Sequence, residues 1–286
     1  MPGIEEIAAR AKAVPLLSQS VLHLLDLMDD PEHSVQDVRR VVETDAGLTA
    51  HVLKVVNSAS FELRYPVDTL DRAVSLLGDK AIMGIALATS SSHLYDRPLA
   101  GYESERGQMW EHSLKTAIAA RETARFALEE TDAGLAYTGG LLHDLGKSII
   151  SEFLQGTAAS LVAQIDGQKT TDYLAAERSV LGTDHCAVGA ALAKHWGLPP
   201  MLGASMRYHH APADAEAPRR SLAYVVHLAD MIAMMGGVGT GADSLLYGLD
   251  ERYATYVDLS PGDLERLMFK VSLEFEKTKA SVFGSE

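Results

Sequence analysis

Apolar residues recur at spacings of three and four along nearly the whole chain, and strictly alternating runs are scarce. A spacing of three to four follows the turn of an α-helix, whereas alternation is typical of a half-buried strand. The pattern therefore predicts an all-α protein. With ends uncertain by about two to four residues, we expect helices at roughly 4–12, 18–29, 34–44, 46–57, 69–78, 79–93, 108–129, 134–146, 158–166, 171–181, 184–196, 199–210, 220–236 and 261–282.

Two of these helices carry start signals. Ser34 and Asp37 have the spacing of a capping box, in which each side chain accepts a hydrogen bond from the other residue's backbone N–H. Ser260 followed by Pro261 places an N-cap residue before a proline at the first helical position. Both signals predict that a helix begins at these points.

The composition changes between residues 95 and 107, where proline, glycine and mixed charges interrupt the helical period. We place a boundary there, between a first helical subdomain over residues 1–98 and a second over 106–286. The helices expected before the boundary are short, and those after it are longer. The glycine-rich and then acidic stretch from Gly236 to Tyr256 is expected to form a loop or a short-helix excursion.

The chain has 286 residues, 47% of them hydrophobic, which is enough for one large core or two moderate ones. Its formal net charge of -14 repels the phosphates of nucleic acids and anionic membrane surfaces, so we expect neither as a partner. The pairs Arg39-Arg40 and Arg219-Arg220 are too short to form a basic patch. A phosphate-containing substrate would need local positive charge, which bound divalent cations supply.

Cys186 is the only cysteine, so an intrachain disulfide is impossible, and this usage fits a reducing compartment. The amino terminus has neither the basic start nor the apolar run of a secretory signal. The most apolar stretches fall short of the length that a membrane span needs. We therefore expect a cytoplasmic protein without a membrane partner. Cys186 itself is interpreted as a small buried hydrophobic residue.

The segment Leu142-His143-Asp144-Leu145-Gly146-Lys147 is the strongest chemical signal in the chain. Its adjacent His and Asp place a nitrogen and an oxygen ligand side by side in an apolar helical stretch. Further donors stand on separate predicted helices, which is how a helical scaffold assembles a closed cluster of metal ligands. The candidate metal ligands are His112, His143, Asp144, His185, His209, His210 and Asp230.

Catalytic roles are expected for two residues of that segment. On a continuous helix, His143 and Asp144 would flank a single face, and Lys147 would lie one turn beyond both. In a site with two metal ions, Asp144 can bridge the ions while imidazoles close each side. Lys147 would then stabilise negative charge on a bound phosphate.

Purely structural roles are the alternative to these assignments. A lone histidine on a helix is more often a packed or surface residue than a ligand. His195 lies off the face of His185 and is interpreted as structural, while His227 either supports a ligand or packs in the core. His209 and His210 could merely stand at a helix end, where imidazoles meet free carbonyl groups.

The order of the candidate ligands along the chain resembles the HD superfamily of metal-dependent phosphohydrolases, and especially its HD-GYP branch. In that branch the same order of ligands builds a site with more than one metal ion. The resemblance covers roughly 108–235. It implies that the core HD ligands are His112, His143, Asp144 and Asp230, and that a second ion is held by His185, His209 and His210.

Three segments in the amino-terminal half add a second resemblance: Val14 to Leu17, Val42 to Phe61, and Thr69 to Gly78. Together with the HD order they look like an HDOD protein, the HD-related output domain of bacterial signalling. This resemblance implies one HDOD domain over roughly 14–215. Within it, an amino-terminal helical subdomain would pack on an HD-like, metal-binding helical bundle.

Two departures from the HD-GYP pattern narrow the expected chemistry. The stretch after His210 lacks the Gly-Tyr-Pro-containing sequence of cyclic di-GMP hydrolases. Gln108 stands one turn before His112, where a carboxylate ligand can occur. These departures argue against hydrolysis of cyclic di-GMP and against a third metal ion.

Functions of two classes remain open, because many HDOD proteins have lost the ligands and are regarded as regulatory modules. The first is a metal-dependent phosphohydrolase or phosphodiesterase acting on a phosphate-containing small molecule or nucleotide. The second is a signalling module that binds partner proteins, with the metal structural or holding a nucleotide without turnover. The expected cofactor is a pair of divalent metal ions, with Fe or Mn favoured and Zn, Ni, Co or Mg compatible.

Overall fold

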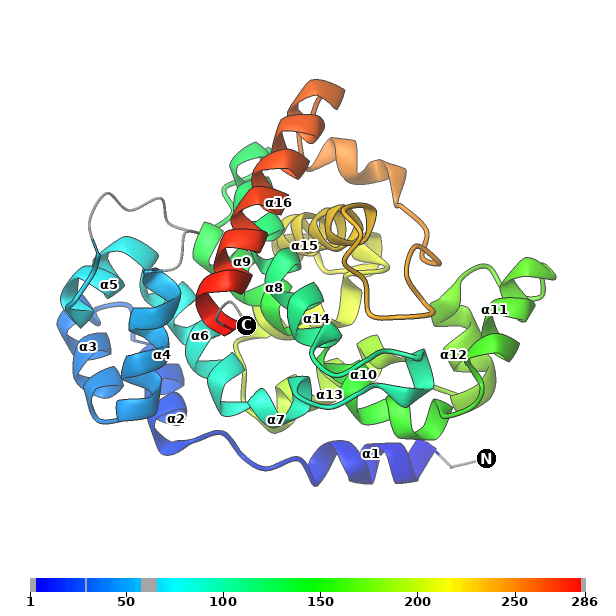
Figure 1. The fold of residues 1–286 in the computed structure, drawn as a ribbon, viewed down its shortest axis with the longest axis horizontal. Helices are drawn as coiled ribbons and strands as arrows, with labels where there is room; N and C mark the ends of the chain where they lie inside the picture. Colours follow the sequence, from blue (N-terminus) through cyan, green and yellow to red (C-terminus); the bar gives the residue numbers. More distant parts are fainter. Residues whose placement is uncertain (1–3, 29, 58–65, 284–286) are drawn as a thin grey trace.

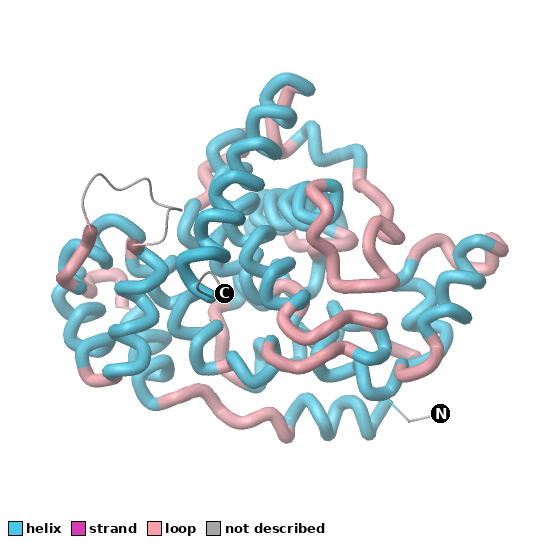
Figure 2. Tube along the Cα trace, in the orientation of Figure 1, coloured by secondary structure: helices cyan, strands magenta, loops and turns pink. Residues whose placement is uncertain are grey.

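The computed structural model describes residues 4–28, 30–57 and 66–283, and it is helical throughout (Figures 1 and 2). Within these residues the only extended pairings are two isolated bridges, Leu99 with Ser104 and Ala127 with Val257. The predicted all-α class is confirmed. The predicted helix end at Asp29, and residues 58–61 of the amino-terminal resemblance, lie outside the described residues.

The amino-terminal helices gather on the left of Figure 1, with α1 running along the lower edge of the molecule. Helix α6 joins this group to the rest of the fold, and its residues from Ala81 to Ala88 are all buried. The bounds are α1 (Ile4–Lys12), α2 (Gln19–Met28), α3 (Val35–Glu43), α4 (Ala46–Val56), α5 (Leu70–Leu77) and α6 (Asp79–Ser90).

The rest of the chain forms a bundle around α8, α9 and α15, and α16 runs from the top of Figure 1 down against α8. The longer elements are α8 (Gln108–Thr123), α9 (Ala133–Leu142), α10 (Leu145–Ile150), α11 (Ala158–Asp166), α12 (Tyr173–Leu181), α13 (His185–His195), α14 (Pro200–Tyr208), α15 (Ala217–Met235) and α16 (Pro261–Phe283). The short helices are α7 (Ser92–Tyr95) and the 3-10 helices η2 (Ala100–Tyr102), η3 (Ala124–Phe126), η4 (Ser151–Leu154), η5 (Pro212–Asp214) and η6 (Glu251–Thr255).

Small residues let the central helices approach closely. A Cβ atom on Gly140 of α9 would lie 2.8 Å from the carbonyl oxygen of Thr116 in α8, and one on Gly84 of α6 would lie 2.2 Å from Thr138 Oγ1. Helix α9 therefore packs against its neighbours backbone to backbone. This contact fixes the position of the residues that follow α9, where the His-Asp pair stands.

Helix α13 is held at both ends. At its start, the carboxylate of Asp184 accepts a hydrogen bond from the backbone N–H of Ala187 at 2.6 Å, as an N-cap residue does. At its far end, Trp196 Nε1 donates to the carbonyl oxygen of Pro15 at 3.0 Å. His195 Nε2 donates to the carbonyl oxygen of Val14 at 3.1 Å, which agrees with its structural interpretation.

Several predicted helices are interrupted. The helix expected over 108–129 ends at Thr123 and continues as η3, and the one expected over 79–93 breaks at Ser91 before α7. The stretch from 236 to 256 forms turns and η6, as expected. The capping box at Ser34 and the helix start at Pro261 are confirmed. The division of the chain at 95–107 stays a prediction.

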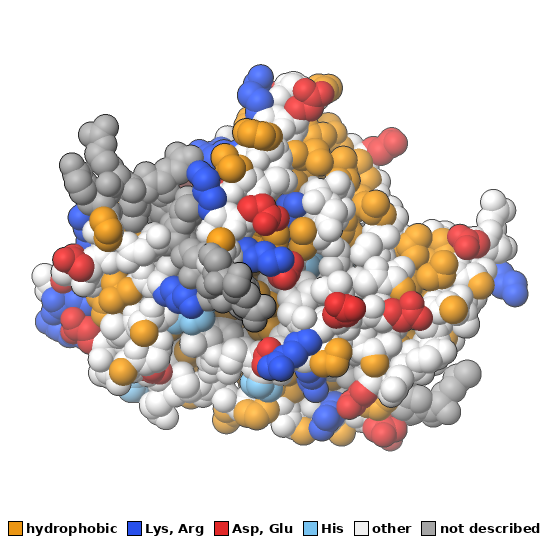
Figure 3. Space-filling view, in the orientation of Figure 1, with side chains coloured by type: hydrophobic (Ala, Val, Ile, Leu, Met, Phe, Trp, Pro, Cys, Tyr) orange, Lys and Arg blue, Asp and Glu red, His pale blue; other side chains and the backbone are white. Residues whose placement is uncertain are grey.

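Acidic and basic side chains are interspersed over the face drawn in Figure 3, and Lys and Arg do not gather there into one patch. Among the described residues, no single helix is long and apolar enough to cross a membrane. Helices α5 and α6 reach the required length and apolar character only when taken together, and they meet at a bend of 108°.

Replacing Ser34 with alanine is expected to lower the free energy of unfolding by about 1 kcal/mol. Ser34 Oγ accepts from the Asp37 N–H at 3.3 Å, and the Asp37 carboxylate accepts from the Ser34 N–H at 3.0 Å. Urea denaturation measures the loss. The control is Ser75→Ala, whose hydroxyl bonds only to a carbonyl one turn back in α5. Equal losses in the two variants would contradict the role of the cap.

Candidate metal centre

The structure brings all seven predicted ligands to one buried centre. They come from α8, the turn between α9 and α10, the start of α13, the end of α14, and α15. No side chain among them is more than 3% exposed. The set comprises His112, His143, Asp144, His185, His209, His210 and Asp230.

The His-Asp pair does not lie within a continuous helix, which corrects the expected helix over 134–146. Helix α9 ends at Leu142, His143 is its C-cap residue, and Asp144 has non-helical backbone angles before α10 begins at Leu145. The change of direction lets α10 pack directly on α13. A Cβ atom on Gly146 would lie 1.9 Å from the carbonyl oxygen of His185, so the two backbones are in contact there.

Four donors form the first half of the centre. His112 Nε2 lies 3.3 Å from His143 Nε2 and 3.1 Å from Asp230 Oδ1. His143 Nε2 lies 3.7 Å from the same Asp230 oxygen. Asp144 Oδ2 is 3.5 Å from His112 Nε2 and 3.4 Å from His143 Nε2.

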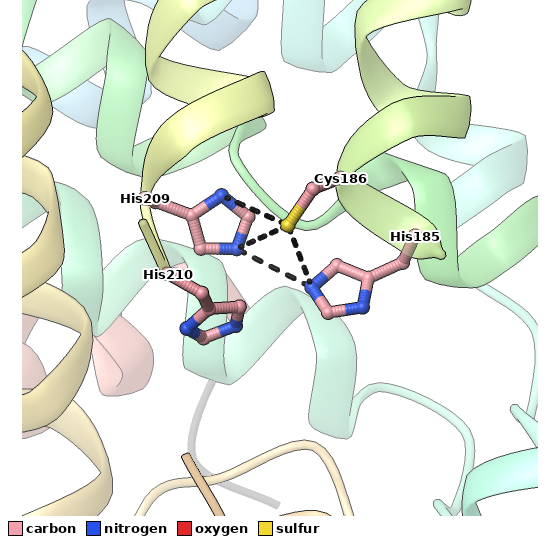
Figure 4. A group of neighbouring side chains, drawn as sticks. All are labelled: His185, Cys186, His209 and His210. Carbon is pink, nitrogen blue, oxygen red and sulfur yellow. Dashed lines mark hydrogen bonds between the residues drawn. The ribbon is translucent and has the colours of Figure 1, made fainter. Parts of the chain in front are cut away.

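The second half uses the other oxygen of Asp144. Oδ1 lies 3.5 Å from both His185 Nε2 and His209 Nε2, and these two nitrogens are 3.4 Å apart. The ring of His210 lies next to them, with its centroid 4.2 Å from that of His209 (Figure 4). Neither ring nitrogen of His210 has a hydrogen-bond partner. Asp144 thus stands between two groups of imidazoles.

Four of the imidazoles are fixed through Nδ1. His112 donates to the carbonyl oxygen of Val238 at 2.9 Å, and His143 to that of Gly140 at 2.7 Å. His209 donates to a carbonyl oxygen of α14 at 3.1 Å, and His185 bonds to a carboxylate at 2.9 Å. A histidine whose Nδ1 carries the proton presents the lone pair of Nε2, as metal-bound histidines do.

Glu177 of α12 was not predicted from the sequence. It is fully buried, and its carboxylate bonds to both the backbone N–H and Nδ1 of His185, each at 2.9 Å. It also accepts from the hydroxyl of Tyr102 at 2.7 Å. A carboxylate behind a histidine orients the ring and increases its basicity. The eight-residue separation of Glu177 from His185 matches no recognisable motif, so this role could not be predicted from the sequence.

Lys147 has partners that the sequence did not reveal. Its Nζ lies 2.8 Å from Asp144 Oδ2, and it donates to Asp243 Oδ2 at 2.6 Å and to Thr240 Oγ1 at 2.8 Å. Asp243 also accepts from the hydroxyl of Tyr247 at 2.7 Å. Segment 236–256 is therefore tied to the centre. The ammonium is shared between two carboxylates and is only 2% exposed.

His227 and Gln108 lie outside the ligand set. His227 Nδ1 donates to the carbonyl oxygen of His209 at 2.6 Å, and its Nε2 accepts from the N–H of Asp250 at 3.0 Å. Both nitrogens are used, so His227 positions the His209 backbone, one of its two predicted alternatives. Gln108 accepts from the N–H of Glu105 at 2.8 Å, at the start of α8.

Burial and neighbouring charges shift the pKa values of the residues at the centre in opposite directions. Burial would raise the pKa of Asp144, but His143 and Lys147 lower it well below its usual range. Burial would lower the pKa of His143, but the carboxylates of Asp144 and Asp230 raise it to about 10. A proton on His143 thus offsets part of the carboxylate charge, and a divalent ion would displace that proton on binding.

The residues fit a pair of divalent metal ions. Oδ1 of Asp144 and Oδ2 of Asp230 are buried without a hydrogen bond, whereas Oδ2 of Asp144 is paired with the Lys147 ammonium at 2.8 Å. A buried carboxylate oxygen without a partner is costly. Ligands about 2.0–2.3 Å from one tetrahedral ion lie about 3.3–3.8 Å from each other. The donor separations in both halves, 3.1–3.7 Å, agree with that spacing. The imidazole and carboxylate donors suit first-row transition metals.

An open cleft of about 470 Å³ leads to the centre at His210. Tyr247 lines the cleft beside His210, and the two rings stack with centroids 3.8 Å apart. The remaining cleft residues come from α12 and from segment 236–256: Asp172, Gly248, Leu249, Asp250, Glu251 and Arg252.

Comparisons with known proteins agree with this architecture. A relative from Treponema pallidum (strain Nichols), named an uncharacterized protein, is 24% identical over 225 residues, which is 79% of this chain and 43% of the relative. The chain thus spans less than half of that relative's length.

Two crystal structures share the fold. An HDOD domain protein of unknown function from Geobacter sulfurreducens has a TM-score of 0.66 at 24% identity, with 99% of this chain and 91% of that chain covered. A protein from Shewanella amazonensis SB2B, provisionally named a phosphohydrolase, has a TM-score of 0.69 at 24% identity, covering 96% and 97%.

The HDOD domain family matches residues 14–212, which is well over half of the chain. The expected resemblance to the HDOD family is therefore confirmed over residues 14–212, which include the helices of the amino-terminal half and the bundle as far as His210. On this evidence, the chain belongs to the HDOD domain family.

Proposed function

We propose that this HDOD protein binds two divalent metal ions and hydrolyses a phosphate ester at them. One observation carries the proposal: the two oxygens of the buried Asp144 carboxylate face two separate pairs of imidazole nitrogens at 3.4–3.5 Å, and Oδ1 has no hydrogen-bond partner. A core histidine cluster without a metal would instead satisfy this carboxylate with hydrogen bonds.

The first ion would be held by His112, His143, Asp144 and Asp230, and the second by Asp144, His185, His209 and His210. Bound divalent ions would neutralise charge on phosphoryl oxygens and activate water for attack on phosphorus. Residues around the ligands hold the donor atoms in position. Lys147 keeps Asp144 in its carboxylate form, and Glu177 orients His185.

The cleft favours a substrate of low charge. Its lining includes the carboxylates of Asp172, Asp250 and Glu251, and Arg252 is paired with Asp250 at 2.6 Å. Such a surface repels polyanions. We therefore propose a small phosphate ester or phosphodiester as substrate.

A second candidate function is a signalling module that binds partner proteins and uses the metal only as a structural staple. It is favoured by the state of Lys147 and His210. The Lys147 ammonium is already bonded to Asp243 and Thr240, and the ring of Tyr247 stacks on one face of the His210 imidazole. Under this proposal, the protein retains its metal and lacks turnover.

Purification without added metal is expected to give about two ions per chain by elemental analysis, on the bridging geometry of a two-metal site. Asp144→Asn is expected to lose both ions, because the amide cannot serve both halves as a carboxylate does. Asp26→Asn is the matched control, since it makes the same change at an exposed residue of α2. A metal-free protein that takes up no ions on addition would refute the metal site.

Turnover of bis-p-nitrophenyl phosphate by the metal-loaded protein separates the two functions. The enzyme proposal expects hydrolysis that falls by at least about a hundredfold in His143→Ala, since loss of a mere supporting group of a ligand costs 10–100-fold. Full metal content without hydrolysis would support the module. Hydrolysis that survives both His143→Ala and Asp144→Asn would assign the activity to a contaminant.

A further inference from the structure

We propose that the thiolate of Cys186 is a ligand of the second metal ion. The inference rests on the proposed metal binding, and it changes the sequence-based interpretation of Cys186 as a buried hydrophobic residue. Sγ lies 3.5 Å from His185 Nε2 and 3.8 Å from His209 Nε2 (Figure 4). Cys186 is 1% exposed, and its ligand atom lies within 4.8 Å of those of the three nearby histidines.

The distances fit a single ion with mixed ligands. Around a tetrahedral ion with sulfur at about 2.3 Å and nitrogen at about 2.0–2.1 Å, a sulfur and a nitrogen lie about 3.5 Å apart. Two such nitrogens lie about 3.3–3.4 Å apart. The observed separations are 3.5 and 3.8 Å for sulfur to nitrogen, and 3.4 Å between the nitrogens of His185 and His209.

Asp144 completes this group. Its Oδ1 lies 3.5 Å from each of the two histidine nitrogens, is buried, and has no hydrogen bond. A carboxylate oxygen without a partner, 1% exposed and facing the same two imidazoles as the thiol, points independently to a cation between them. The second half of the centre thus offers two imidazoles, a carboxylate and a thiolate.

Cys186 then takes the place among the ligands of the second ion that the family resemblance and the proposed function above give to His210. The ring of His210 lies flat on Tyr247, with an interplanar angle of 12°, and it lines the cleft. Cys186 Sγ lies 3.5 Å from His185 Nε2 and 3.8 and 3.9 Å from the two ring nitrogens of His209. We infer that Cys186 is the inner ligand and that His210 faces the position open to substrate.

Ligation forms a sulfur–metal bond and releases the thiol proton to water. Cys186 lies in the first turn of α13, where the helix dipole favours an anion. A thiolate is a soft ligand, so the second half would prefer Zn, Co or Fe over Mn or Mg. The first half has only nitrogen and oxygen donors, so it would not prefer Zn, Co or Fe over Mn to the same extent. The two ions are therefore distinguishable.

The test is spectroscopic titration of the metal-free full chain with Co(II). Wild type is expected to bind two ions and to develop near-ultraviolet thiolate-to-cobalt charge-transfer absorption. Cys186 is the only cysteine, so this absorption can arise from no other residue. Cys186→Ser is expected to lose it entirely and to bind the second ion at least about tenfold more weakly. X-ray absorption of the zinc-loaded protein should show one sulfur at about 2.3 Å.

The outcomes separate this inference from the proposed function. Two bound cobalt ions without charge-transfer absorption would overturn the role of Cys186 and leave the metal site standing. Absence of cobalt binding would overturn both. Far-ultraviolet circular dichroism of the metal-free variants checks folding. If Cys186→Ser fails to fold, the sulfur distance in zinc-loaded wild type decides the question by itself.

Discussion

Replacing Lys147 with methionine is expected to destabilise the metal-free protein by about 3–5 kcal/mol, the usual effect of removing one partner of a buried ion pair. The side chain is only 2% exposed, and its ammonium lies 2.8 Å from Asp144 and 2.6 Å from Asp243. Methionine fills a similar volume but leaves two buried carboxylates without their cation. Urea denaturation after treatment with a chelator measures the effect.

Lys80→Met is the matched control. Its ammonium pairs with Asp132 at 3.0 Å, but both side chains are more than 40% exposed. An exposed pair contributes at most about 1 kcal/mol. Adding Asp243→Asn to Lys147→Met should recover part of the loss, because it removes one of the two stranded charges. Similar small losses for the two lysine variants would show that the buried ion pair is not a determinant of stability.

Replacing Gly146 with alanine is expected to cost about 3 kcal/mol or more, at the upper end for overpacking. The added Cβ would lie 1.9 Å from the carbonyl oxygen of His185 and 2.8 Å from the backbone nitrogen of Gly189. Both are backbone atoms that no rotamer change can move. Helices α10 and α13 must separate, so His185 and Cys186 should also lose their alignment. Thermal unfolding and metal content report the two effects.

Gly203→Ala makes the same change where there is room. Its Cβ would meet only Ala193 Cβ, at 3.7 Å, and Gly203 lies inside α14. Alanine has the higher helix propensity, so this variant should be neutral or more stable by up to about 1 kcal/mol. Equal behaviour of the two glycine variants would mean that α10 does not pack on α13 as closely as described.

The sequence predicted the fold well where a helix has a clear period and a clear end. Helix α11 matches its predicted range, and α3 begins at its predicted capping box. Prediction failed at the His-Asp pair, because apolar residues continue at helical spacing through Leu141, Leu142 and Leu145. The break there depends on contact between α10 and α13. These helices are far apart in the sequence and meet only in the folded chain.

The residues of the candidate centre were likewise predicted only in part. Donor chemistry and family resemblance together identified seven side chains that the structure brings to one place. They did not identify Glu177 or Asp243, since a carboxylate that supports a ligand has no fixed spacing from it. Cys186 was overlooked because a single cysteine beside small residues is typical of a core position. Its direction toward His209 depends on where α13 begins.

Helix α13 has a mechanical consequence. Its first turn carries His185 and Cys186, and its far end is bonded through His195 and Trp196 to the segment between α1 and α2. The eleven residues of α13 span about 16 Å, and a helix of this length moves as a rigid unit, so a displacement at one end reaches the other. A partner protein that displaced the amino-terminal segment would therefore shift the donors and change their affinity for a cation. By thermodynamic reciprocity, gain or loss of the cation changes that protein's affinity by the same factor.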